Sequence, residues 1–174
     1  MIRLSDHIAA AGGWLSLEAF LQLALHHPQE GYYSSSMENI GQRGDFSTTP
    51  TLSPILAKAI VAHWKEACSR CGRRLPLLEI GAGSGALAVK ILERLGFWNR
   101  LNTDYVIVES SPRLREFQHL LLGGRAKIYS TMEKALKHCG GKAFIFSNEL
   151  VDAFPARVFE YTEQDWKEVA LLVK

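Results

Sequence analysis

The stretch "LLEIGAGSGALA" at residues 77–88 constrains the fold of this chain more than any other segment. It begins with a short apolar run that contains one acid, Glu79, and it ends with a run of helix-forming residues. Three glycines stand between these runs at alternate positions, 81, 83 and 85. Glycine allows a tight turn and a close approach of the backbone to a ligand. The stretch therefore predicts a buried strand, a ligand-binding turn and the N-terminus of a helix.

Strand and helix patterns alternate through most of the chain. Apolar strand patterns lie at residues 75–81, 104–110, 126–130 and 143–149, with amphipathic helical patterns between them. Such alternation is typical of parallel strands joined by right-handed crossovers, which form a Rossmann-like, open, mostly parallel α/β sheet. Outside this region, residues 4–27 are predicted to be helical and residues 157–173 to form a hairpin.

Length and charge restrict the classes of function. The 174 residues suffice for a domain with a sizeable core. Twenty basic and 18 acidic residues leave a net charge of only +2, so neither a nucleic-acid nor an anionic membrane surface is expected. No apolar run approaches the roughly 20 residues of a membrane span, and the N-terminus lacks a signal-peptide pattern. We expect a cytoplasmic protein, or a mitochondrial one if a targeting segment has been removed.

The three cysteines do not predict a metal site. Cys68 and Cys71 form a C-x-x-C pair, but a structural zinc site needs four ligands and the chain has no second pair. We therefore expect reduced thiols and no metal.

Polar residues gather at three predicted strand ends, which is where open α/β sheets bind their ligands. These ends are residues 79–85, 109–111 and 147–152. Glu109, followed by Ser110, closes the second strand, where a carboxylate can accept hydrogen bonds from both hydroxyls of a ribose. "GAGSGA" also fits a relaxed dinucleotide fingerprint, with Glu109 at the spacing expected of its acid. A fragment of an NAD(P)- or flavin-binding oxidoreductase is therefore one alternative.

Glu79 distinguishes the two kinds of cofactor. An acid two residues before the first glycine is unfavourable beside the pyrophosphate of a dinucleotide. It suits S-adenosylmethionine, whose methionine end carries an ammonium group and whose sulfur is a cation. The resulting pattern, E-x-G-x-G-x-G, is that of class I methyltransferases and favours S-adenosylmethionine over a dinucleotide.

Five segments in order resemble the MidA family of class I methyltransferases. They are "GYYSS", "IGQRGDFSTTPTLSPILAKAIVAHW", "LLEIGAGSGALA", "VIVESSPRLREFQ" and "FSNELVDAFPARVF". The resemblance runs from about residue 4 to residue 170, and the family includes a mitochondrial enzyme that methylates an arginine of a complex I subunit. It implies an enzyme that transfers a methyl group in line from S-adenosyl-L-methionine to a protein, at arginine, and releases S-adenosyl-L-homocysteine.

The resemblance also implies which residues form the site. The cofactor-binding residues would be Gly44, Asp45, Phe46, Thr48, Pro50, Glu79, Gly81, Ala82, Gly83, Ser84, Gly85, Glu109 and Ser110. The catalytic residues would be Asn148, Glu149 and Asp152. Because methyl transfer depends on orienting the acceptor, the two carboxylates would hold a guanidinium group. The amide of Asn148 would fix the acceptor or the methionine portion of the cofactor.

The length of the chain gives a last expectation, because members of this family are longer. Residues 1–52 would form a helical segment and a loop over the cofactor, and residues 53–174 a partial methyltransferase core, incomplete at the C-terminus. The segment "VALLVK" would then leave an open apolar edge that a second copy or a partner covers. A non-catalytic, cofactor-binding assembly module that needs a missing C-terminal half is a further alternative.

Overall fold

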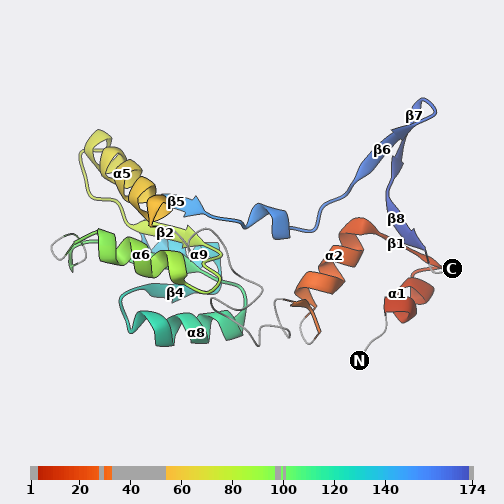
Figure 1. Cartoon of the computed structure of the whole chain (residues 1–174), viewed down its shortest axis with the longest axis horizontal. Helices are drawn as coiled ribbons and strands as arrows, with labels where there is room; N and C mark the ends of the chain where they lie inside the picture. Colours follow the sequence, from red (N-terminus) through yellow and green to blue (C-terminus); the bar gives the residue numbers. More distant parts are fainter. Residues whose placement is uncertain (1–3, 28–29, 33–53, 97–98, 100, 173–174) are drawn as a thin grey trace. The chain divides into compact units, whose positions relative to one another are not determined.

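The computed structural model describes residues 4–27, 30–32, 54–96, 99 and 101–172. The chain divides into two compact units (Figure 1). The larger unit is Glu38–Leu150, and the smaller unit combines Met1–Met37 with Val151–Lys174. The boundary predicted between residues 52 and 53 lies outside the described residues.

The larger unit is built on a parallel sheet of four strands in the order β4-β3-β2-β5. The strands are β2 (Leu77–Ile80), β3 (Tyr105–Val108), β4 (Lys127–Tyr129) and β5 (Phe144–Ser147). Leu77 of the inner strand lies opposite Tyr105 on one side and Phe144 on the other. Each strand falls within one of the four predicted segments, and the predicted α/β class is confirmed.

One helix precedes these strands, three connect them, and together they cover both faces of the sheet. They are α5 (Ile55–Arg70), α6 (Ala86–Arg94), α8 (Pro112–Leu122) and α9 (Met132–His138). Local signals set the limits of α8. The Ser111 hydroxyl accepts a hydrogen bond from the Leu114 N–H at 3.4 Å, and Gly123 ends the helix in a left-handed conformation.

The strand side chains alternate between two apolar layers. Leu77 and Tyr105 pack with α5 and α6 in one layer, whereas Leu78 and Val106 pack with α9 in the other. Glu79 shares the face of Leu77, two residues along β2. The acid of the glycine motif therefore enters the layer beneath α5 and α6.

The smaller unit contains short elements from both ends of the sequence. They are α1 (Leu4–Ala10), β1 (Trp14–Ser16), α2 (Leu17–His26), the 3₁₀ helix η1 (Val151–Ala153), β6 (Phe159–Thr162), β7 (Asp165–Glu168) and β8 (Ala170–Leu172). The predicted hairpin is present as the antiparallel pair β6–β7. Its turn residues Glu163 and Gln164 both have positive φ angles, which is the geometry of a two-residue hairpin turn.

The helical prediction for residues 4–27, whose apolar stripes break at two glycines, was wrong at β1. Gly12 and Gly13, with φ angles of 88° and 94°, interrupt the helix, and Trp14 pairs with Leu172 of β8. A strand of three residues is too short to show an alternating pattern, so only its distant partner defines it. The segment predicted to carry a bare edge therefore pairs along one side with this chain's own β1.

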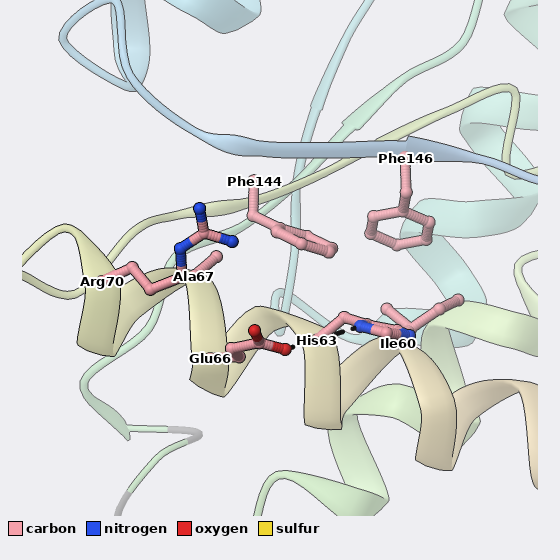
Figure 2. A pocket seen from close by; sticks show the side chains of 7 residues that line it. All are labelled: Ile60, His63, Glu66, Ala67, Arg70, Phe144 and Phe146. Atoms are coloured by element: carbon pink, nitrogen blue, oxygen red, sulfur yellow. Dashed lines mark ion pairs between the residues drawn. The ribbon is translucent and has the colours of Figure 1, made fainter.

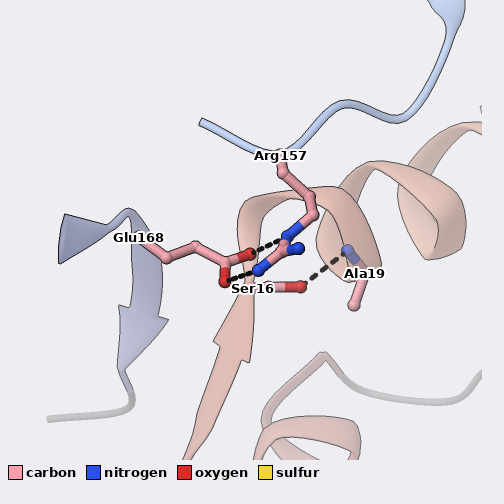
Figure 3. Close-up of polar contacts among 4 residues, drawn as sticks. All are labelled: Ser16, Ala19, Arg157 and Glu168. Carbon is pink, nitrogen blue, oxygen red and sulfur yellow. Dashed lines mark hydrogen bonds and ion pairs between the residues drawn. The ribbon is translucent and has the colours of Figure 1, made fainter. Parts of the chain in front are cut away.

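Two polar contacts of the smaller unit fix local geometry (Figure 3). The Ser16 hydroxyl accepts a hydrogen bond from the Ala19 N–H at 3.2 Å and so caps the N-terminus of α2. The Arg157 guanidinium donates two hydrogen bonds to the Glu168 carboxylate, at 3.0 and 2.7 Å. This pairing lowers the pKa of Glu168 and links the segment before β6 to the last residue of β7. None of the described helices is long and apolar enough to cross a membrane.

Candidate active site

The glycine loop joins β2 to α6 at the carboxyl edge of the sheet. Gly81, Gly83 and Gly85 have φ angles of 67°, 53° and 73°, in the left-handed region that glycine enters readily. The Gly81 N–H donates to the Val108 carbonyl at 2.8 Å, and the Gly85 N–H donates to the Ala82 carbonyl at 2.8 Å. The loop is therefore tied to β3 at its start and closed on itself at its end.

The first two glycines differ in what surrounds them. A methyl group added to Gly81 would lie 2.6 Å from Cδ1 of Leu150, so a side chain there would force the Leu150 side chain to shift. A methyl group added to Gly83 would meet nothing within 4 Å. The close contact brings the segment after β5 to the start of the loop, while the middle of the loop borders open space.

Glu79 is 2% exposed, and its Oε2 accepts a hydrogen bond from the Tyr105 hydroxyl at 2.7 Å. Burial raises the pKa of Glu79 to about 7, although the hydrogen bond from Tyr105 acts in the opposite direction. The negative charge of Glu109 adds to the rise. A buried acid with such a pKa at a strand end is the kind of group that clusters at functional sites.

Glu109 is the second buried acid and directly follows β3. Its Oε1 accepts a hydrogen bond from the Ser111 N–H at 3.0 Å, and its Oε2 accepts one from Nε2 of Gln118 at 3.5 Å. Burial raises the pKa of Glu109, while these hydrogen bonds and the positive charge of Arg115 partly oppose the rise. Arg115 also donates to the backbone carbonyls of Glu109 and Ser110, at 2.8 and 2.7 Å.

Three of these residues were not singled out by the sequence analysis: Tyr105, Arg115 and Gln118. Tyr105 left no signal in the sequence, because only the sheet register, in which it lies opposite Leu77, places it on the same face as Glu79. Gln118 did leave a signal. Gln118 is a polar residue at an otherwise apolar helical spacing, between Leu114 and Leu122.

The remaining predicted site residues lie in several places. Ala82 is buried, and the Ser84 hydroxyl accepts a hydrogen bond from the Ala86 N–H at 3.4 Å. Asn148 is half-buried after β5, and Glu149 is exposed with a φ angle of 48°, a conformation uncommon for glutamate. Asp152 is exposed in η1 of the smaller unit. Five predicted cofactor contacts lie outside the described residues: Gly44, Asp45, Phe46, Thr48 and Pro50.

A separate hollow of about 550 Å³ lies between α5 and β5. Figure 2 shows the rings of Phe144 and Phe146 pointing from β5 toward the helix, where Ile60 lies. His63 and Glu66 form an ion pair on the helix, with 3.9 Å between Nδ1 and Oε2. None of the predicted site residues lines this hollow, so it is distinct from the glycine loop. Within the described part of the chain, no group of three or more His, Cys, Asp or Glu residues could hold a metal ion.

Comparisons with known proteins agree with this geometry. A family model described as "Putative S-adenosyl-L-methionine-dependent methyltransferase" matches residues 55–174. Among curated proteins, the chain is similar to the mitochondrial protein arginine methyltransferase NDUFAF7 of Xenopus tropicalis, with 26% identity over 91% of this chain and 43% of the relative. The corresponding protein of Danio rerio is 28% identical over 94% of this chain and 45% of the relative.

Two solved structures from Burkholderia thailandensis are also similar. One, bound to S-adenosyl-homocysteine, has a TM-score of 0.79 and 29% identity, and the match covers 98% of this chain and 46% of that one. A native crystal structure from the same bacterium has a TM-score of 0.76 at 29% identity. This chain therefore spans less than half the length of the proteins that it matches.

The residues of the glycine-loop edge fit such a cofactor on the geometry alone. The loop is open in its middle, two buried acids flank it, and one buried polar atom beside it, Oε1 of Gln118, has no hydrogen-bond partner among the described residues. The family model matches more than half of the chain and includes this whole edge. The chain belongs to the MidA-type family of S-adenosyl-L-methionine-dependent methyltransferases.

Proposed function

We propose that this chain binds S-adenosyl-L-methionine at the carboxyl edge of its parallel sheet and serves methyl transfer to a protein arginine. The observation that carries the proposal is the pair of buried acids, Glu79 near the end of β2 and Glu109 directly after β3, at the edge of the sheet that carries the open glycine loop. Support comes from the similar structure bound to S-adenosyl-homocysteine and from relatives named as protein arginine methyltransferases.

Each part of the edge has a proposed role toward the cofactor. Glu109 accepts hydrogen bonds from the ribose hydroxyls, and the open middle of the loop at Gly83 lets the backbone approach the ligand. Glu79 supplies negative charge near the cationic methionine end. The other proposed contacts are Gly81, Ala82, Ser84, Gly85 and Ser110, with Gly44, Asp45, Phe46, Thr48 and Pro50 from the upstream segment.

The bound cofactor supplies an electrophilic methyl group, and the residues of the chain orient the acceptor toward it. Glu149 lies beside Leu150, which contacts the first glycine of the loop. We place the acceptor guanidinium against the Glu149 carboxylate, which would accept the proton that the attacking nitrogen loses on methylation. Asn148 fixes the acceptor through its amide. Asp152 stays a sequence prediction, because it belongs to the other unit.

A nicotinamide or flavin site fits less well. A dinucleotide brings a pyrophosphate dianion to the glycine loop, and two buried acids beside that loop would disfavour it. The cellular compartment stays a prediction as well, since the sequence favours the cytoplasm whereas the curated relatives are named as mitochondrial proteins.

Methyl transfer can be measured with S-adenosylmethionine labelled in its methyl group. Two peptide mixtures serve as acceptors: one contains arginine, and the other has lysine at the same positions. We expect label in the arginine peptides alone. Glu149→Gln should reduce transfer while leaving cofactor binding intact, and Glu163→Gln, also exposed and at a positive φ angle, is the matched control. Equal labelling of both mixtures would contradict arginine as the acceptor, and no labelling of either would contradict transfer by this chain.

A further inference from the structure

We propose that Gln118 is a positioning residue that holds the Glu109 carboxylate and the glycine loop in one fixed arrangement for the cofactor. The inference rests on the proposed function, because it concerns the same site. It assigns a role to a residue of α8 that lies behind the proposed cofactor contacts and is itself inaccessible, at 0% exposure.

The carboxamide of Gln118 connects two segments that are distant in the sequence. Its Nε2 donates a hydrogen bond to the Gly83 carbonyl at 2.9 Å and lies 3.5 Å from Oε2 of Glu109. Gly83 follows β2 and Glu109 follows β3, so one NH₂ group links the two strand ends that would bind opposite parts of the cofactor. An amide nitrogen carries two hydrogens and can serve both acceptors.

Several contacts orient the Glu109 carboxylate, and a hydrogen bond with the backbone of Gly83 is one of them. The Ser111 N–H holds Oε1 at 3.0 Å, and the Gln118 amide holds Oε2. With a donor on each oxygen, the plane of the carboxylate is fixed before any ligand arrives. Preorganisation of this kind lowers the cost of ordering a site on binding.

The other end of the Gln118 amide argues against a purely structural role. Its Oε1 is buried and has no hydrogen-bond partner among the described residues. A buried acceptor without a partner destabilises a protein, and an apolar side chain of similar size would avoid that cost. The neighbouring positions of the same stripe, Leu114 and Leu122, are apolar. The donor at Nε2 is therefore the reason for a glutamine at this position.

The test compares Gln118→Met with wild type by calorimetric titration with S-adenosyl-homocysteine and by thermal unfolding without ligand. Methionine keeps the length of the side chain and removes both the donor and the unpaired acceptor. We expect the Kd to rise about five- to tenfold, the value of an ordinary hydrogen bond, because the contact between Nε2 and Oε2 of Glu109 is long at 3.5 Å. We expect no decrease in the unfolding temperature. Gln22→Met on α2, at an exposed position, is the matched control and should change neither quantity.

A double-mutant cycle separates positioning from independent binding. If Gln118 acts through Glu109, Gln118→Met should weaken binding much less in a Glu109→Gln background than in wild type. An undiminished effect in that background would contradict the inference. If Gln118→Met does not fold, Gln118→Asn, whose amide is withdrawn by one methylene, should show the same loss of affinity.

The outcomes distinguish this inference from the proposed function. If wild type does not bind S-adenosyl-homocysteine, the proposed function is wrong and this inference with it. If wild type binds and Gln118→Met binds equally well, only the inference is wrong. A lower unfolding temperature with unchanged affinity of the folded protein would assign Gln118 a structural role instead.

Discussion

The ionisation of Glu79 gives a prediction about pH and stability. Its pKa is about 7 in the folded protein against 4.5 ordinarily, because it is buried. Between these two values the folded state binds more protons than the unfolded state, so the free energy of unfolding falls as pH rises. For a rise of this size the loss is on the order of 3 kcal/mol.

Glu79→Gln cannot ionise and should therefore flatten this dependence. Urea denaturation at pH 5 and pH 8 measures the free energy of unfolding at both ends of the interval. The difference between the two should shrink in Glu79→Gln and persist in Glu93→Gln, which alters an exposed glutamate of α6. An undiminished difference in Glu79→Gln would show that Glu79 ionises freely in the folded protein.

Glu109 should contribute directly to cofactor affinity. Glu109→Ala removes charge-assisted hydrogen bonds to the ribose and should weaken S-adenosyl-homocysteine binding by about 1–3 kcal/mol. Calorimetric titration measures the change, with Glu116→Ala on the exposed side of α8 as the control. Wild-type affinity in a folded Glu109→Ala variant would contradict the placement of the ribose.

At the scale of residues, the sequence predicted some parts of the candidate site and not others. Glu79 and Glu109 could be found because each lies at the end of an apolar strand pattern, so their neighbourhood follows from the sheet. Tyr105 and Gln118 could not be assigned in the same way. Their contacts depend on the register of two strands and on how α8 packs, and neither is encoded in local spacing.

At the scale of elements, the glycine loop offers a matched comparison. Gly83 and Gly72 both have positive φ angles, of 53° and 62°, and an added methyl group would meet nothing within 4 Å at either. Alanine at either position should therefore cost a similar backbone strain, about 1–2 kcal/mol. Only Gly83 borders the proposed cofactor.

We expect Gly83→Ala to weaken S-adenosyl-homocysteine binding more than its effect on stability explains, and Gly72→Ala to leave binding unchanged. Calorimetric titration and thermal unfolding of both variants provide the comparison. Equal binding by the two variants would show that the ligand does not lie against the middle of the loop.

The predicted elements were accurate where local signals were strong. The four strands and α8 follow from apolar runs, a serine–proline start and a glycine stop. β1 was missed because its three residues are specified by pairing with β8, at the other end of the sequence. Long-range pairing of so short a strand has no local signature.

At the scale of the whole molecule, the edge strand β5 of the parallel sheet predicts association between chains. β5 is one of the two edge strands of the described sheet, its Ile145 is 47% exposed, and its two phenylalanines border the hollow beside α5. Unpaired edge strands with apolar side chains tend to pair with other chains. The protein should therefore associate as its concentration rises.

Ile145→Lys should reduce this association, because a charge on the edge disfavours strand pairing. Ile55→Lys is the control, since Ile55 is 73% exposed on a helix of the same unit. Sedimentation velocity across a range of concentrations measures the effect. A wild-type chain that stays monomeric, or equal effects of the two variants, would contradict a role for the β5 edge.

The central claim is that the carboxyl edge of this sheet binds S-adenosylmethionine, and the most direct test is a calorimetric titration of the purified chain. S-adenosylmethionine, S-adenosylhomocysteine and NADH are titrated separately under the same conditions. The account predicts binding of the first two and no binding of NADH. Binding of NADH alone, or of none of the three, would contradict it.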